Sequence, residues 1–185
     1  MSKPLRQLWD SMLFIVYVEG QDAERVKVIR QLIAHVNEER IQPVISAFAI
    51  AEIRSYRADD DTPAALGDEP RRPVVPAHAD EVRQMFESGQ LERHAVSPSI
   101  AQKAAEIGNA YPSLLPPDCV HIATAIVTGV DSLLTWDGAG KRRRPREMLR
   151  YDGLIDGLAI KQPFDPFPSL DGLIATAPNA PEQPS

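Results

Sequence analysis

Residues 116–137 read PPDCVHIATAIVTGVDSLLTWD. The first part predicts a helix, because two prolines suit its opening turn, apolar residues continue to Thr128, and Gly129 ends it. Residues 132–135 then predict a short strand that finishes just before Asp137. Helices that alternate with buried strands build a parallel sheet covered on both faces, so this stretch indicates an α/β fold.

The rest of the chain repeats the alternation. Strands are expected at 8–9, 43–46, 94–96 and 157–161, and helices at 22–40, 47–56, 80–87 and 98–110. The helix at 22–40 has the clearest pattern, since its apolar residues follow helical spacing. Asp10 and Ser11 mark a junction from strand to helix. The prediction is a central, mostly parallel sheet with helices on both sides.

Two segments interrupt this pattern. Residues 58–80 hold four prolines and six acids, with almost no aliphatic periodicity, and we interpret them as a flexible surface insertion. From Pro163 the chain has six prolines and little charge, which predicts an ordered wrap followed by a loose tail. The expected division is therefore a domain at 1–162 and a C-terminal tail at 163–185.

Composition limits the class of protein. A chain of 185 residues that is 43% hydrophobic can form one domain with a genuine core. The single cysteine, Cys119, excludes an internal disulfide and suits a reducing compartment. The apolar stretch Met12–Val18 is too short to span a membrane, and no cleavage site follows it. We expect a soluble, cytoplasmic protein without membrane contact.

Four acids stand at or just past short apolar runs. They are Asp10, Glu52, Asp118 and Asp137. Groups at the carboxyl ends of parallel strands gather at one edge of a sheet, and Asp118 falls in a helical first turn, where the dipole favours its ionised form. Clustered carboxylates would repel one another. A divalent cation makes them compatible, and Mg²⁺ prefers such hard oxygen ligands.

Four segments carry a family resemblance: LWDSMLFI (8–15), ISAFAIAEI (45–53), PDCVHIATA (117–125) and GVDSLLTWD (129–137). Their order and spacing resemble the PIN-domain ribonucleases, most closely the toxin subunits of the VapBC type. The resemblance implies a compact α/β/α sandwich and a Mg²⁺ or Mn²⁺ site at the four acids. It also implies metal-dependent cleavage of RNA, a cognate antitoxin and frequent homodimers.

Several nearby residues have simpler interpretations. Asp131 suits a turn that feeds the next strand, and Cys119 suits a small core position. His121 is expected to be a buried, hydrogen-bonded histidine rather than a catalytic one. Ser11 and Thr135 can hydrogen-bond the acids or a metal-bound water, or cap local backbone. No spacing of histidine and cysteine offers a rival zinc site.

The charge distribution bears on the substrate. A net charge of −6 argues weakly against a generic nucleic-acid binder. A basic run that includes Lys141, Arg142, Arg143 and Arg144 nevertheless follows Asp137 closely. It is either a solvated loop or a contact for RNA phosphates, and the sequence leaves both open.

Two other functions compete with a ribonuclease. A non-catalytic PIN-like module that binds protein or RNA is suggested by the acidic insertion and the proline-rich tail, although such a module has no need of four acids. A phosphohydrolase of the haloacid dehalogenase type would need an Asp two residues after Asp10, where Met12 stands.

Overall fold

A parallel five-stranded sheet forms the centre of the computed structural model, which describes residues 3–56, 75–139, 147–164 and 166–167. All four strand pairs are parallel. In sheet order the strands are β3 (Glu92–His94), β2 (Ile41–Ser46), β1 (Leu5–Trp9), β4 (Ser132–Leu134) and β5 (Ile160–Lys161). The α/β prediction, including the parallel sheet, is confirmed.

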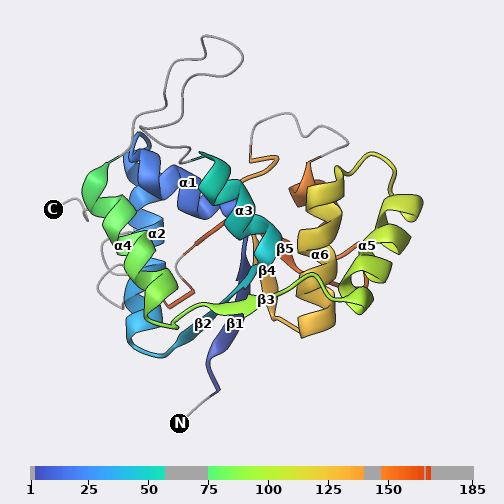
Figure 1. Ribbon diagram of the computed structural model, residues 1–185, viewed down its shortest axis with the longest axis horizontal. Coiled ribbons are helices and arrows are strands. Elements are labelled where there is room, and N and C mark those ends of the chain that lie inside the picture. The colour runs from blue at the N-terminus through green and yellow to red at the C-terminus, as the bar shows by residue number, and fades with distance from the viewer. Residues whose placement is uncertain (1–2, 57–74, 140–146, 165, 168–185) are drawn as a thin grey trace, which may run out of the picture.

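Helices cover both faces of the sheet (Figure 1). One face carries α1 (Ser11–Glu19), α2 (Ala23–Asn37), α3 (Ala47–Tyr56) and α4 (Pro76–Glu87). The other face carries α5 (Pro98–Ala110), α6 (Pro116–Thr128) and the short 3₁₀ helix η1 (Met148–Tyr151). The result is a three-layer α/β/α arrangement.

The core divides at β1, where successive side chains point to opposite faces. Leu8 packs with the α5 and α6 side of the core, and Trp9 packs with the α1 to α4 side. Both side chains are fully buried, so the central strand is apolar on both faces, as parallel sheets require. The next residue, Asp10, is the first that emerges beyond the end of the strand.

Most expected elements lie within a few residues of their predicted bounds. Helices α3, α5 and α6 match the expected ranges, and Ser97 caps α5 by accepting the backbone N–H of Ile100 over 3.3 Å. The strand expected at 94–96 is wrong by two residues, because β3 runs over Glu92–His94 in register with β2. The last strand is confined to two residues at its predicted end.

The insertion expected at 58–80 ends earlier than predicted. Helix α4 begins at Pro76, and both His78 and Ala79 are buried. The Val75 backbone N–H donates to the carbonyl of Val18 over 2.8 Å, which ties this segment to the end of α1. Residues 76–80 therefore belong to a helix that packs on the core through His78 and Ala79, whereas 57–74 lie outside the described residues.

The start of the C-terminal segment contacts the domain. The ring of Phe167 lies 3.9 Å from the Arg40 guanidinium and 5.1 Å, edge to face, from the ring of His35. The expected division into a domain at 1–162 and a tail at 163–185 stays a prediction. Residues 168–185, which include most of the predicted tail, lie outside the described residues.

Candidate functional site

The site begins where β1 and β4 end. Asp10 follows β1 directly, and Thr135 follows β4 on the neighbouring strand. The Thr135 hydroxyl donates to Asp10 Oδ2 over 2.7 Å, and the Ser11 hydroxyl donates to Asp10 Oδ1 over 3.3 Å. Asp10 is only 2% exposed. These hydrogen bonds stabilise a carboxylate that would be costly to bury alone.

Asp137 lies two residues beyond Thr135. Its backbone N–H donates to Thr135 Oγ1 over 2.9 Å, and its Oδ2 accepts the backbone N–H of Met148 over 2.7 Å. The chain turns at Gly138 with φ at +87°, and a Cβ there would lie 2.9 Å from the Cβ of Glu147. Only glycine fits this turn without displacement, so the loop holds Asp137 in place.

His121 connects the strand ends to α3. Its Nε2 lies 3.0 Å from Glu52 Oε2 and 3.7 Å from Asp10 Oδ1. Its Nδ1 lies 2.9 Å from the hydroxyl of Ser46, the last residue of β2. Ser46 Oγ also accepts the backbone N–H of Ala49 over 3.2 Å, in the first turn of α3. One buried imidazole thus links β2, α3 and the end of β1.

The charges of this pair stabilise each other. Burial alone disfavours the imidazolium, but the hydrogen bond to Glu52 and the negative charge of Asp10 outweigh it and raise the pKa of His121. Burial likewise disfavours the Glu52 carboxylate, but the hydrogen bond and charge of His121 outweigh it and lower the pKa of Glu52.

Asp118 lies in the first turn of α6, where its Oδ2 accepts the backbone N–H of Leu115 over 3.3 Å. Burial, together with the charges of Asp137 and Asp10, raises the pKa of Asp118 to about 7. The hydrogen bond from Leu115 opposes this shift without cancelling it. Asp118 therefore carries much of the electrostatic repulsion of the site.

The four predicted acids line a single hollow of about 390 Å³. Its walls are formed by Asp10, Ser11, Met12, Ile15, Glu52, Leu115, Asp118, His121, Asp137 and Met148. The acids come from four separate segments of the chain, as predicted. The basic run Lys141, Arg142, Arg143 and Arg144 lies outside the described residues.

The structure also shows where the secondary candidates lie. Asp131 accepts the backbone N–H of Arg6 over 2.8 Å at the opposite edge of the sheet, away from the acids. Cys119 is buried in the core, as expected. His121 is buried and hydrogen-bonded, which confirms its expected environment, and it belongs to the acidic site as well.

Sequence reasoning missed Ser46. Its hydroxyl contacts His121 from the far side of the ring, and its position at the strand-to-helix junction was the available signal. A hydroxyl there suggests a helix cap, which it also is. Contact with a histidine 75 residues away depends on how α6 packs, and the local sequence does not encode that.

The donors of the site suit a divalent cation. Single ligand atoms of Asp10, Glu52 and His121 all lie within 4.8 Å of one another. Asp118 and Asp137 add carboxylate oxygens on the same hollow. A cation would offset the mutual repulsion that helps raise the pKa of Asp118. The residues present therefore fit Mg²⁺ or Mn²⁺, which take hard oxygen ligands.

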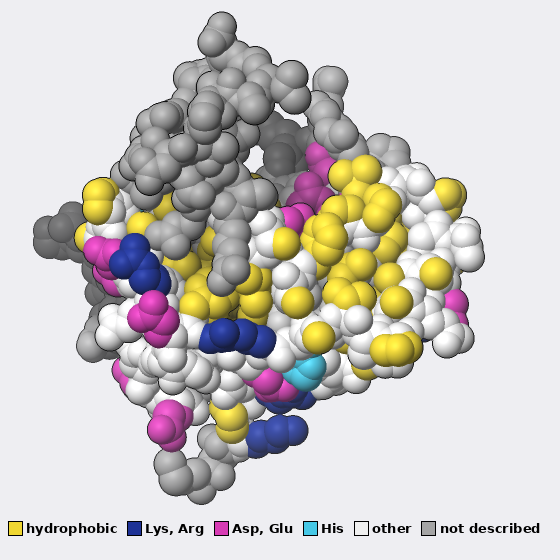
Figure 2. All heavy atoms as spheres, viewed as in Figure 1, with side chains coloured by type: hydrophobic (Ala, Val, Ile, Leu, Met, Phe, Trp, Pro, Cys, Tyr) yellow, Lys and Arg dark blue, Asp and Glu magenta, His cyan; other side chains and the backbone are white. Residues whose placement is uncertain are grey.

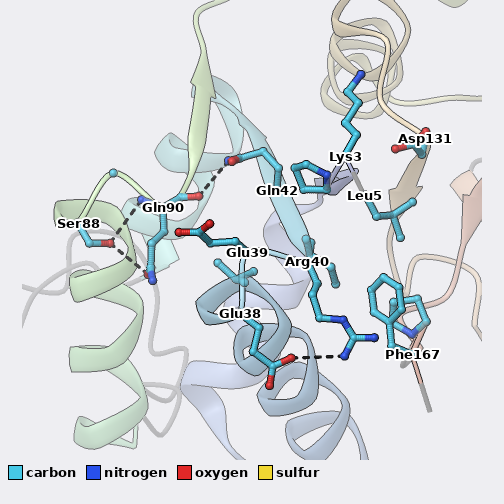
Figure 3. A pocket seen from close by; sticks show the side chains of 15 residues that line it. Lys3, Leu5, Glu38, Glu39, Arg40, Gln42, Ser88, Gln90, Asp131 and Phe167 are labelled. Atoms are coloured by element: carbon cyan, nitrogen blue, oxygen red, sulfur yellow. Dashed lines mark hydrogen bonds and ion pairs between the residues drawn. The ribbon is translucent and has the colours of Figure 1, made fainter. Parts of the chain in front are cut away.

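A larger hollow of about 1130 Å³ lies at the other edge of the sheet, where β1 and β2 begin (Figure 3). Its lining mixes both charges, and Arg40 pairs with Glu38 over 3.4 Å. Phe167 lies beside Arg40 in this view (Figure 3). Mixed and partly paired charges do not make a cation site, so the smaller acidic hollow is the better candidate.

None of the helices in the described part of the chain is long and apolar enough to cross a membrane.

Comparisons with known proteins agree with the α/β/α fold. The family model of the PIN domain matches residues 10–143, a range that includes all four acids. A chain in the crystal structure of VapBC2 from Rickettsia felis bound to a DNA fragment from its promoter is similar in fold, with a TM-score of 0.54 at 9% identity. That match covers 85% of this chain and 98% of the other.

A chain of a toxin–antitoxin complex from Klebsiella pneumoniae matches with a TM-score of 0.47 at 18% identity, over 77% of this chain and 99% of that one. A search of curated protein sequences found no match.

Proposed function

From the premise that the chain belongs to the PIN domain family, we propose that it is a metal-dependent endoribonuclease, the toxin of a toxin–antitoxin pair. One observation carries the proposal: four acids from four segments meet in one hollow, together with a buried histidine. An ordinary loop carboxylate has no reason to lie close to three other acids and a histidine. Asp10 is buried and the other three acids are half-buried. Mutually repelling acids at the carboxyl edge of a parallel sheet are typical of a catalytic centre.

Asp10, Glu52, Asp118 and Asp137 would hold the Mg²⁺ or Mn²⁺. When bound, the metal supplies charge neutralisation for the phosphodiester and lowers the pKa of a coordinated water. The chain itself supplies rigidity. Thr135 fixes Asp10 and the backbone of Asp137 together, and α6 carries Asp118 and His121 on neighbouring turns. Such fixed donors stabilise developing charge without reorganising during the reaction.

RNA phosphates are the proposed partners of Lys141, Arg142, Arg143 and Arg144. The described residues on both sides of this run lie at the site. Before it, Asp137 lines the hollow, and after it Met148 lines the same hollow and donates to Asp137. In the sequence, the run therefore lies between two residues of the site. Cations so near the acids in the sequence would contact RNA phosphates and position the backbone of the RNA.

An antitoxin is the proposed protein partner. The sequence resemblance to VapBC toxin subunits supports this, and so does the fold similarity to a chain of VapBC2. Hydrophobic side chains gather over α6, with acidic side chains at the upper border of the patch (Figure 2). Phe48 and Val127 are exposed on α3 and α6, and Leu115 is exposed at the start of α6. We expect an antitoxin to cover this surface.

Homodimerisation remains a prediction, which light scattering of the purified chain would check. A small DNA-binding protein encoded in the adjacent reading frame would support the antitoxin assignment.

The decisive experiment measures cleavage of RNA by purified full-length protein with Mg²⁺ or Mn²⁺, and again after addition of EDTA. Asp10→Asn and Asp137→Asn should remove cleavage. Asp131→Asn is the matched control, because Asp131 is an acid at the opposite edge of the sheet and Asn can still accept the Arg6 N–H. Cleavage that persists after complete chelation would contradict the proposal. No cleavage, with no Mn²⁺ binding that depends on Asp10, would favour the non-catalytic module.

A further inference from the structure

We propose that His121 Nε2 is a direct ligand of the metal ion, so that the site is a mixed carboxylate and imidazole site that favours Mn²⁺ over Mg²⁺. The inference rests on the proposed function and adds a ligand that the acidic pattern does not contain. It starts from the position of His121, which is 1% exposed and faces two of the four acids through the same nitrogen.

The distances suit shared coordination. Ligand atoms that occupy adjacent positions of an octahedral ion at about 2.1 Å lie about 3 Å apart. His121 Nε2 lies 3.0 Å from Glu52 Oε2 and 3.7 Å from Asp10 Oδ1. Suitable atoms of all three residues lie within 4.8 Å of one another. An ion can therefore contact the three with small side-chain adjustments and no movement of the sheet.

The hydrogen-bond network permits the required tautomer. Nε2–H donates to the Glu52 carboxylate, and Nδ1 lies 2.9 Å from the Ser46 hydroxyl. A hydroxyl both donates and accepts, so Ser46 can accept Nδ1–H when the metal takes the place of the proton on Nε2. The proton then sits on Nδ1, and the Nε2 lone pair faces the two acids. Metal-binding histidines commonly hold their second nitrogen in this way.

The chemistry of the donor sets the metal preference. Carboxylate and water ligands suit Mg²⁺ and Mn²⁺ alike, whereas imidazole is a softer donor that suits transition metals. A single nitrogen ligand therefore raises the affinity for Mn²⁺ relative to Mg²⁺. A purely structural histidine would leave the ratio of the two affinities unchanged, because it would touch neither ion.

Electron spin echo measurements on the Mn²⁺-loaded full-length protein, without RNA, test the inference directly. Nitrogen bound to Mn²⁺ modulates the echo, and growth on ¹⁵N-histidine should change the modulation from the ¹⁴N to the ¹⁵N pattern. His121→Gln should abolish it, since Gln offers no nitrogen lone pair whichever way its amide faces. His94→Gln is the control, because His94 also pairs with a glutamate, Glu92 at 2.7 Å, at β3.

Calorimetry gives a second readout. His121→Gln should weaken Mn²⁺ binding by about tenfold or more, and Mg²⁺ binding by much less, so that the preference for Mn²⁺ falls. Asp10-dependent Mn²⁺ binding without nitrogen modulation would overturn the inference and leave the proposed ribonuclease intact. Absence of Asp10-dependent Mn²⁺ binding, together with absence of RNA cleavage, would overturn both.

Discussion

Thr135 donates its hydroxyl hydrogen to Asp10 across 2.7 Å, although 125 residues separate the two in the chain. The same oxygen accepts the backbone N–H of Asp137. One hydroxyl therefore fixes the spacing between the carboxylate after β1 and the carboxylate after β4. Both members of this contact are buried, so its strength is little reduced by water.

Thr135→Val should consequently lower both stability and metal binding, because valine keeps the shape of threonine and removes the hydroxyl. The Asp10 carboxylate loses a buried donor, which should cost about 1–3 kcal/mol in the free energy of unfolding of the metal-free protein. Urea denaturation measures this. Thr135→Ser keeps the hydroxyl and serves as the control. Equal stability of the valine variant and the wild type would show that the contact contributes nothing.

Asp118→Asn should raise the melting temperature of the metal-free protein at neutral and higher pH, and should remove RNA cleavage. The folded-state pKa of Asp118 is about 7, above the ordinary value of 3.8. The folded state therefore holds a proton that the unfolded chain releases, and stability falls as pH rises from about 4 to about 7. Above pH 7 Asp118 is ionised in both states, so its effect on stability no longer changes with pH.

The difference in melting temperature between Asp118→Asn and wild type, measured in EDTA, should thus be small near pH 4 and largest above pH 7. Comparing the two proteins at each pH cancels the part of the titration of His121 and Glu52 that does not depend on the charge of Asp118. A pH-independent difference for Asp118→Asn would contradict the raised pKa.

The positions of the four acids could be predicted because the parallel sheet supplies a rule. Carboxyl ends of parallel strands share one edge, so residues just beyond 9 and 134 had to be neighbours once the strands were recognised. The position of Glu52 could be predicted from the helix that begins directly after β2. These inferences depend on local patterns and on general topology.

What the sequence did not reveal depends on packing between distant segments. The contact of His121 with Glu52 and Ser46 follows from the way α6 lies against α3 and β2. The early start of α4 also depends on packing between distant segments, because His78 is buried through stacking on Tyr17, at a centroid distance of 4.4 Å. The prolines around residue 76 made the start of this helix hard to recognise from the spacing of apolar residues. Tertiary contacts, which that spacing does not reveal, stabilise its first turn.

Gly138→Ala should weaken metal binding and cleavage, although residue 138 carries no functional group. A Cβ at this position would lie 2.9 Å from the Cβ of Glu147, in a backbone conformation that favours glycine. The loop must shift, and it carries Asp137. Gly129→Ala is the matched control: Gly129 also has positive φ, at +62°, but nothing lies within 4 Å of the added Cβ, and the residue ends α6 away from the acids.

Both glycine variants should lose about 1 kcal/mol of stability from backbone strain. Only Gly138→Ala should lower the Mn²⁺ affinity measured by calorimetry. Equal Mn²⁺ affinities for the two variants would show that the turn does not position Asp137.

Replacement of Arg143 and Arg144 by Gln should weaken RNA binding without changing Mn²⁺ affinity. The run supplies no oxygen ligands, but its flanking residues lie at the acidic hollow. Each lost phosphate contact should flatten the dependence of log affinity on log salt by about 0.7 for single-stranded RNA. Binding is measured at several salt concentrations in an Asp118→Asn background, so that the RNA survives.

The control removes two cations from exposed helical positions, Lys27 on α2 and Arg83 on α4, with the same change in net charge. A general electrostatic effect would flatten the salt dependence equally in both double variants, since long-range attraction depends on net charge. Direct contact predicts a larger change for Arg143 and Arg144. Equal slopes in the two double variants would make the basic run a solvated loop, and the RNA would then have to be held by other residues around the acids.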